Sequence, residues 1–345
     1  MRVEMDDPEA DWTRPGVFEV APEVFRIPLP LPQDGLHAVN VYALRDGDGL
    51  TLIDAGWTVG EARELLEKAL AALDCGVSDV RRFLVTHAHR DHYTLAVTLR
   101  REYGNRVSLG VGEQPNFAVL TRSDATLLGM YEERLTRCGA RSLLDWLRQV
   151  SPHLPHDPEN WSEPDEWLVS GQEVSLAART LQVVETPGHT RGHVVFVDRA
   201  AELMFAGDHV LPHITPSIGF EAALAELPLA DYLGSLRLVR ELPDRRLLPA
   251  HGPVAPSVHS RVDELLRHHE RRLDQTWRAV GNSGATAWEV AGRLTWTRRE
   301  RLLVELDPFN QLLAALEASA HLDLLAAQGR LKFVELEGVR HYEQP

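Results

Sequence analysis

The feature that most constrains this chain is the segment His87-Ala-His89-Arg-Asp91-His92, which places four metal-ligand side chains within six positions. Residues 83–86 predict a buried strand before it, and the residues after Asp91 predict a helix. Residues two apart in an extended segment point the same way, so His87 and His89 can converge on one ion. The helix N-terminus favours the Asp91 carboxylate, and Asp91 and His92 can reach a second ion. Four donors in this arrangement indicate a metal site.

Further ligand residues follow three other predicted strands. His189 follows the strand predicted at 180–184, Asp208 the one at 202–205, and His251 the one at 246–249. A Gly or Pro near each of them turns the chain sharply. Each residue alone would be ordinary, but their recurrence at one edge of a predicted sheet indicates that they complete the coordination of two ions.

With a His-x-His-x-Asp-His motif followed by distant His, Asp and His, the chain resembles the metallo-β-lactamase superfamily over roughly residues 20–255. The resemblance implies an α/β fold, an αββα sandwich with the site at one edge. It also implies how the ligands are divided between the two metal ions. The first ion would be held by His87, His89 and His189, and the second by Asp91, His92 and His251. Asp208 would bridge the two ions. Asp54 matches the family's early Asp, and we expect it to support the ligand loops through hydrogen bonds.

Such a site predicts hydrolysis by a metal-bridging hydroxide. Two cations about 3.5–4 Å apart lower the pKa of a water between them towards about 7. Asp91 is the expected catalytic residue, because it can orient the hydroxide and carry a proton to the leaving group. Two zinc ions are the expected cofactors for imidazole and carboxylate ligands, and manganese or iron would fit nearly as well.

Several residues beside the ligands are also candidates for a role in the site. We expect His193 to lie behind the ligands and support them. Four others are candidates for substrate contact: Tyr93, Tyr131, His209 and His213.

The pattern of predicted elements divides the chain into two parts. Residues 1–256 are expected to form the catalytic domain, with an insertion or cap at about 112–165 that holds helices around 117–134 and 140–150. Residues 257–345 predict a helix at 261–280, a second helix capped by Thr286, a third at 308–328 capped by Asp307, and a hairpin at 331–342. Three helices and a hairpin are the outline of a winged-helix domain.

Charge and composition argue against several partners. The net charge of −15 repels phosphate backbones and acidic lipid surfaces. The tail carries 12 Arg and Lys against 13 Asp and Glu, and its third helix has no Arg or Lys. We therefore expect a packing module, a homodimer interface or a lid on the site rather than a DNA-reading helix. Without a signal peptide or an apolar stretch of about 20 residues, the chain is predicted to be cytoplasmic and to have no membrane segment.

Three functions remain open at this stage. The first is hydrolysis of a small-molecule thioester, ester or lactone, similar to glyoxalase II. The second is a phosphodiesterase or endoribonuclease, because a winged-helix-like tail also resembles the β-lactamase-like protein 2 group. The third is a mononuclear iron oxygenase or a non-catalytic scaffold, against which the complete ligand set argues. The sequence does not name the substrate, since specificity is expected from the insertion and the 208–220 loop.

Overall fold

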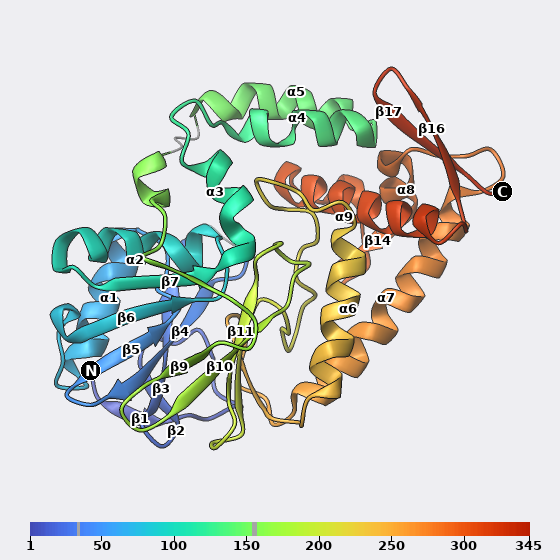
Figure 1. The fold of residues 1–345 in the computed structure, drawn as a ribbon. Helices are drawn as coiled ribbons and strands as arrows, with labels where there is room; N and C mark the ends of the chain where they lie inside the picture. Colours follow the sequence, from blue (N-terminus) through green and yellow to red (C-terminus); the bar gives the residue numbers. More distant parts are fainter. Residues whose placement is uncertain (33–34, 154–156) are drawn as a thin grey trace.

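The computed structural model describes residues 1–345 except 33–34 and 154–156. Two β-sheets lie face to face, helices cover their outer faces, and the last helices and a hairpin gather at one side (Figure 1). The predicted αββα sandwich is confirmed.

Among the described residues, the first sheet has eight strands, which follow one another in sequence order. Neighbours from β2 to β5 are antiparallel, whereas those from β5 to β8 are parallel. The strands are β1 (Val3–Met5), β2 (Val17–Ala21), β3 (Val24–Pro30), β4 (Ala38–Asp46), β5 (Gly49–Ile53), β6 (Val80–Val85), β7 (Arg106–Gly110) and β8 (Glu166–Leu168). The sequence analysis did not predict β1, β2, β7 or β8. Of these, β1 and β8 are only three residues long and lack a buried apolar run.

In the described part of the chain the second sheet has the strand order β13-β12-β11-β10-β9, and β12 and β13 are parallel. Its strands are β9 (Glu173–Ser175), β10 (Thr180–Glu185), β11 (Val194–Asp198), β12 (Leu203–Gly207) and β13 (Arg246–Pro249). A buried core lies between the two sheets, in which the ring of Tyr42 meets that of Phe205 edge to face at 5.4 Å. The carboxyl ends of β5, β6, β10, β12 and β13 therefore come to one edge of the sandwich, where their following residues can meet.

Helices cover both outer faces of the sheets. They are α1 (Gly60–Ala71), α2 (Arg90–Tyr103), α3 (Gln114–Leu120), α4 (Leu127–Cys138), α5 (Arg141–Val150), α6 (Pro228–Glu241), α7 (Val258–Val280), α8 (Ala287–Arg293) and α9 (Pro308–Ala327). The prediction of one helix at 117–134 is wrong. Residues 121–126 interrupt it, and the side chain of Thr126 accepts a hydrogen bond from the Gly129 amide to begin α4.

The tail begins with α7, whose first turn is capped by Ser257. Thr286 and Glu289 form the predicted capping box of α8, and Asp307 caps α9 with Pro308 in its first turn. Strands β14 (Thr295–Trp296) and β15 (Arg301–Leu302) form a small sheet, and β16 (Lys332–Leu336) and β17 (Val339–Glu343) form the predicted hairpin. The winged-helix assignment and the boundary near residue 256 remain predictions.

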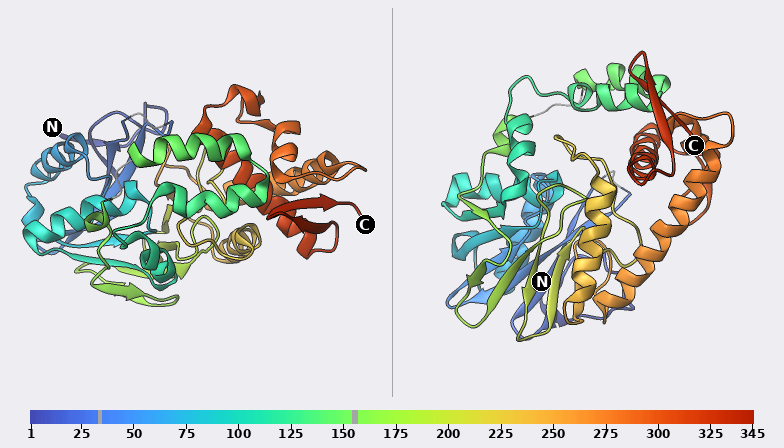
Figure 2. Two further views of the ribbon diagram at one scale, coloured as in Figure 1. Left: turned by 90° about the horizontal axis from the view of Figure 1, so that it is seen from above. Right: turned by 45° about the vertical axis from the view of Figure 1, so that its right-hand side comes forward.

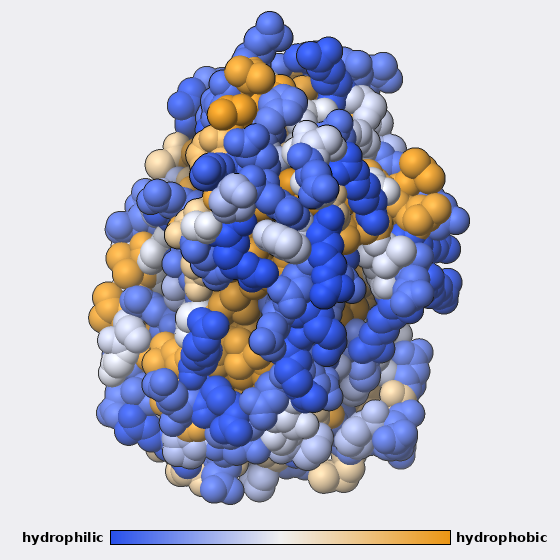
Figure 3. Space-filling view, turned by 90° about the vertical axis from the view of Figure 1, so that its right-hand side faces the viewer, coloured by the Kyte–Doolittle hydropathy of each residue, from blue (hydrophilic) through white to orange (hydrophobic). Residues whose placement is uncertain are grey.

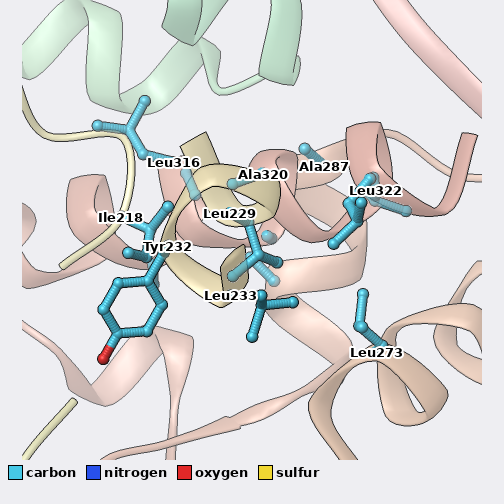
Figure 4. Packing of buried hydrophobic residues seen from close by; sticks show 14 of the residues in the cluster. Ile218, Leu229, Tyr232, Leu233, Leu273, Ala287, Leu316, Ala320 and Leu322 are labelled. Carbon is cyan, nitrogen blue, oxygen red and sulfur yellow. The ribbon is translucent and has the colours of Figure 1, made fainter. Parts of the chain in front are cut away.

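Helix α9 shares a hydrophobic core with elements far away in the sequence. Leu316 and Ala320 of α9 are buried in one cluster with Leu229 of α6 and Leu273 of α7 (Figure 4). The insertion joins the same cluster through Leu135 of α4, and α4 and α5 lie over α9 in two views (Figures 1 and 2). Because its alanines let neighbouring helices approach closely, α9 is buried along most of its length.

The face on the α7 and hairpin side is mostly hydrophilic, and its hydrophobic side chains gather in small separate areas (Figure 3). None of the helices in the described part of the chain combines the length and the apolar character that a membrane crossing requires. The predicted cytoplasmic location and homodimer are not tested by these features.

Candidate metal centre

The seven expected ligands all follow carboxyl ends of strands at one edge of the sandwich. The segment His87–His92 leaves β6 and enters α2, whose N-cap is His89. His189 follows β10, Asp208 follows β12, and His251 follows β13. Gly188 has a φ of +136°, and a Cβ there would lie 2.4 Å from the Tyr232 backbone. Only glycine fits this turn, which brings His189 to the others.

The side chains of His87, His89, His189 and Asp208 form the first of two donor groups. One ligand atom from each of these residues lies within 4.8 Å of the others. Nε2 of His87 is 2.9 Å from Nδ1 of His89, which in turn is 3.0 Å from Nε2 of His189. Nε2 of His189 is 3.4 Å from Oδ2 of Asp208.

The hydrogen bonds of the outer ring nitrogens determine which tautomers are present in this first group. Nε2–H of His89 donates to the Phe220 carbonyl at 2.9 Å, and Nδ1–H of His189 donates to the Ser217 carbonyl at 2.8 Å. In the neutral rings, the two nitrogens that face each other therefore carry no proton. Two lone pairs 3.0 Å apart repel each other unless a cation lies between them, so the donor set fits a metal ion.

Asp91, His92 and His251 form the second donor group. Nδ1–H of His92 donates to Asp54 at 2.9 Å, and Nδ1–H of His251 donates to the Ala38 carbonyl at 2.7 Å. The other nitrogen of each ring is buried and lacks a hydrogen-bond partner among the described residues. Buried polar atoms without a partner are costly, and a second cation would satisfy both of them.

Asp208 faces both groups with different oxygens. Its Oδ2 lies near His189 of the first group, whereas its Oδ1 is 3.3 Å from Nε2 of His251 and 3.7 Å from Nε2 of His92. Oδ1 is also buried without a hydrogen-bond partner in the described part of the chain. This position suits a carboxylate that bridges two cations.

Burial and neighbouring charges shift the pKa values of the histidines in the two donor groups in opposite directions. Burial and the adjacent histidines hold the pKa of His87 well below its usual value, and burial lowers the pKa of His89 to about 3. Their neutral rings keep the lone pairs that a metal needs. Burial opposes charge on His92 and His251 as well, but there the carboxylates of Asp91 and Asp208 prevail and raise both pKa values.

Asp54 and His193 lie behind the ligands. The Asp54 carboxylate accepts hydrogen bonds from the Thr86 amide at 2.8 Å and from His92. Nε2 of His193 accepts from the Asp208 amide at 3.1 Å, so its Nδ1–H donates to Thr186 Oγ1 at 2.9 Å. Each residue thus connects a ligand to a neighbouring strand end.

The four candidates for substrate contact lie in different surroundings. Tyr93 is buried, and its hydroxyl donates to the Ser162 carbonyl at 2.7 Å. The ring of Tyr131 stacks on that of Phe220 at 5.2 Å. His209 is buried against Tyr232, and only His213 is exposed. The structure therefore packs Tyr93, Tyr131 and His209 into the interior, where none of them faces solvent.

Sequence reasoning missed several polar residues that brace the ligand loops. Asn40 donates to the carbonyls of Pro249 and Gly252, on either side of His251. Glu113 accepts hydrogen bonds from the amide of Ala88 and the hydroxyl of Thr190, and burial raises its pKa to about 7. Asn40 is a polar residue inside the apolar run 39–44, and this sequence signal could have pointed to its role. Glu113 carried no such signal, because its partners come from distant loops.

Comparisons with known proteins identify the family and the fold. The model of the Metallo-beta-lactamase superfamily matches residues 34–251. A solved beta-lactamase domain protein from Burkholderia ambifaria is 30% identical, with a TM-score of 0.81 over 99% of this chain and 98% of that one.

Two curated relatives are similar over most of the chain. One is the Bacillus subtilis protein named Probable metallo-hydrolase YqjP, 25% identical over 88% of this chain and 91% of its own length. The other is the Atrochrysone carboxyl ACP thioesterase AacuM of Aspergillus aculeatus, 25% identical over 94% of this chain and 87% of its own length. Some other curated relatives are longer, and the chain spans 65% and 44% of two of them. From the family match and the shared fold, the chain belongs to the metallo-β-lactamase superfamily.

Proposed function

We propose that this protein is a dinuclear metal-dependent hydrolase that cleaves a small thioester, ester or lactone. The observation that carries the proposal is the position of Asp208, which turns one carboxylate oxygen to each of two buried donor groups. Imidazole and carboxylate donors suit zinc, and manganese or iron are the next choices.

Two divalent cations would supply Lewis acidity towards a carbonyl oxygen and would acidify a water molecule at neutral pH. The chain contributes by fixing the donors before substrate arrives. The carbonyls of Phe220 and Ser217 hold His89 and His189 in one tautomer, and Asp54 does the same for His92. Such outer contacts keep ligand rings oriented and basic.

Asp91 is the residue that we propose moves the proton. Its side chain is 13% exposed, more than those of His92, His189, Asp208 and His251, so it can reach a bound substrate. Burial opposes its charge, but His92 and His251 hold its pKa well below the usual value. Asp91 therefore stays ionised at neutral pH, where it can accept a proton from the attacking water and pass it to the leaving group.

A thioester is the favoured substrate among the three. The AacuM relative, whose name states an ACP thioesterase, matches nearly the whole chain. In this reaction water is consumed, the acyl carbon–sulfur bond breaks, and a carboxylate and a thiol are released. Nucleic acid is a weaker candidate, because α9 carries no Arg or Lys and is buried against neighbouring helices.

The test is to measure metal content and hydrolysis on the same protein. The purified chain would be stripped with a chelator, reloaded with zinc, manganese or iron, and assayed with acyl thioesters, lactones, a phosphodiester and single-stranded RNA. We expect two metal ions per chain and thioester, ester or lactone cleavage that is lost on stripping and restored on reloading. One iron per chain, or RNA cleavage without any esterase activity, would overturn the proposal.

A further inference from the structure

The irregular segment 217–223 holds two histidines of the first donor group. Its Ser217 carbonyl accepts from His189, and its Phe220 carbonyl accepts from His89. The segment contains neither helix nor strand. Its place is therefore determined by contacts with other parts of the chain, and we name it the positioning loop.

Arg134 of the inserted helix α4 donates three hydrogen bonds to the positioning loop. Its Nη1 donates to the carbonyls of Gly219 at 3.3 Å and Glu221 at 2.5 Å, and its Nη2 donates to that of Ala222 at 2.8 Å. These three carbonyls flank Phe220 on both sides. The planar, forked guanidinium can satisfy several acceptors at once, which an ammonium group cannot do in one fixed geometry.

Aromatic packing holds Phe220 itself from two directions. Tyr131 of α4 stacks on its ring at 5.2 Å with planes 6° apart, and Phe309 of α9 meets it edge to face at 5.4 Å. The guanidinium of Arg134 also lies over the Tyr131 ring, 5.1 Å from its centre. The insertion and the tail thus both contact the one residue whose carbonyl orients His89.

Apolar and polar contacts hold the rest of the loop. Ile218 is buried in the same cluster as Leu316 of α9 and Tyr232 of α6 (Figure 4). Asn116 of α3 donates to the Glu221 carboxylate at 3.1 Å and accepts from the Ala223 amide at 2.7 Å. Glu221 also accepts from the Arg191 amide, two residues after His189. The loop therefore has little freedom to move once these contacts form.

We propose that the insertion positions the first metal site, with Arg134 as the positioning residue that acts through the Phe220 carbonyl on His89. The inference rests on the proposed dinuclear function. It assigns the insertion a role in metal binding, in addition to the covering role expected from the sequence. Arg134 acts through the backbone of the positioning loop, so its effect must appear in how tightly the first donor group holds an ion.

The experiment titrates the stripped protein with Co²⁺ and follows the visible absorption of each site. We expect Arg134→Met to weaken the first site about 10- to 100-fold, as other changes behind metal ligands do, and to leave the second site unchanged. Arg134→Lys should fall between this variant and the wild type. Arg137→Met is the matched control, because Arg137 lies one turn further along α4 and pairs with Glu133 at the surface.

Two further variants make the result decisive. His251→Ala removes a side chain from the second donor group only. The absorption change that remains in this variant therefore belongs to Co²⁺ in the first donor group. Phe309→Ala removes the ring of α9 that packs against Phe220. It should lower the Co²⁺ affinity of the first donor group, and it tests the proposal even if Arg134→Met fails to fold.

The two proposals would fail in different ways. A wild-type chain that binds no metal would overturn the proposed function. A wild-type chain that binds two ions, with Arg134→Met or Phe309→Ala binding them equally well, would overturn the role of the insertion alone.

Discussion

Oδ2 of Asp54 lies 2.9 Å from Nδ1 of His92, and both side chains are almost completely buried. Asp54 follows β5 with a φ of +59°, and its other oxygen accepts from the Thr86 amide after β6. The carboxylate therefore joins two strand ends and turns Nε2 of His92 towards the second donor group. A side chain outside both donor groups thus decides where the Nε2 atom of His92 points.

The first prediction concerns this pair. Asp54→Asn keeps the size of the side chain but loses the charge, and its amide cannot accept from both Thr86 and His92. We expect zinc affinity at the second site to fall about 10- to 100-fold, measured by calorimetric titration. Asp46→Asn is the control, because Asp46 is also a buried carboxylate but accepts from Thr51 and Ala177. Equal losses in the two variants would contradict a specific role for Asp54.

The second prediction concerns the bridging position. Asp208→Ala removes an oxygen from each donor group, so we expect metal loading and hydrolysis to be abolished while circular dichroism still shows a folded chain. Asp145→Ala, at an exposed position on α5, should load two ions like the wild type. Full activity in Asp208→Ala would refute the bridging role.

The third prediction tests Tyr93 as a packing residue. Its hydroxyl donates to the Ser162 carbonyl inside the molecule, so Tyr93→Phe should lower the free energy of unfolding by about 1 kcal/mol. Because the group does not face solvent, KM and kcat should stay unchanged. A large rise in KM with unaltered stability would instead support the substrate contact expected from the sequence.

The fourth prediction concerns pH and the buried pair His269 and His321. Nδ1 of His269 lies 3.3 Å from Nε2 of His321, and Nδ1–H of His321 donates to the Glu317 carbonyl. Burial lowers the pKa of His321 to about 3, and burial together with His321 holds that of His269 well below its usual value. Arg272 also disfavours a positive charge on both.

The sign of this effect follows from proton binding. Below about pH 6.5 the unfolded chain binds protons at these histidines and the folded chain does not, so stability is lost as the pH falls towards 3. In that range each histidine lowers the free energy of unfolding by about 1.4 kcal/mol for every pH unit. Urea unfolding of the metal-free chain from pH 7 to 5 should therefore show a smaller loss for His321→Gln than for the wild type. The exposed control His153→Gln should match the wild type.

Much of the fold could be predicted because its signals are local. Short apolar runs predict β3 to β6 of the first sheet and all the described strands of the second. Thr286 and Asp307 predict the starts of two tail helices, which the structure confirms. The interruption before α4 escaped prediction because residues 121–126 contain neither Gly nor Pro. Strand β1 escaped it because its pairing with β2, not its own composition, makes it a strand.

The sequence by itself determined the chemical identity of the centre: three histidines and a carboxylate within six positions, and further donors after other strands. Only the tertiary structure decided how those donors are divided and oriented. Asp91 and His251 are 160 positions apart yet lie 3.4 Å from each other, because β6 and β13 end at the same edge of the sandwich. Phe220 became the acceptor for His89 because α4 and α9 enclose its ring. Such contacts depend on the packing of distant segments, which no local pattern of residues encodes.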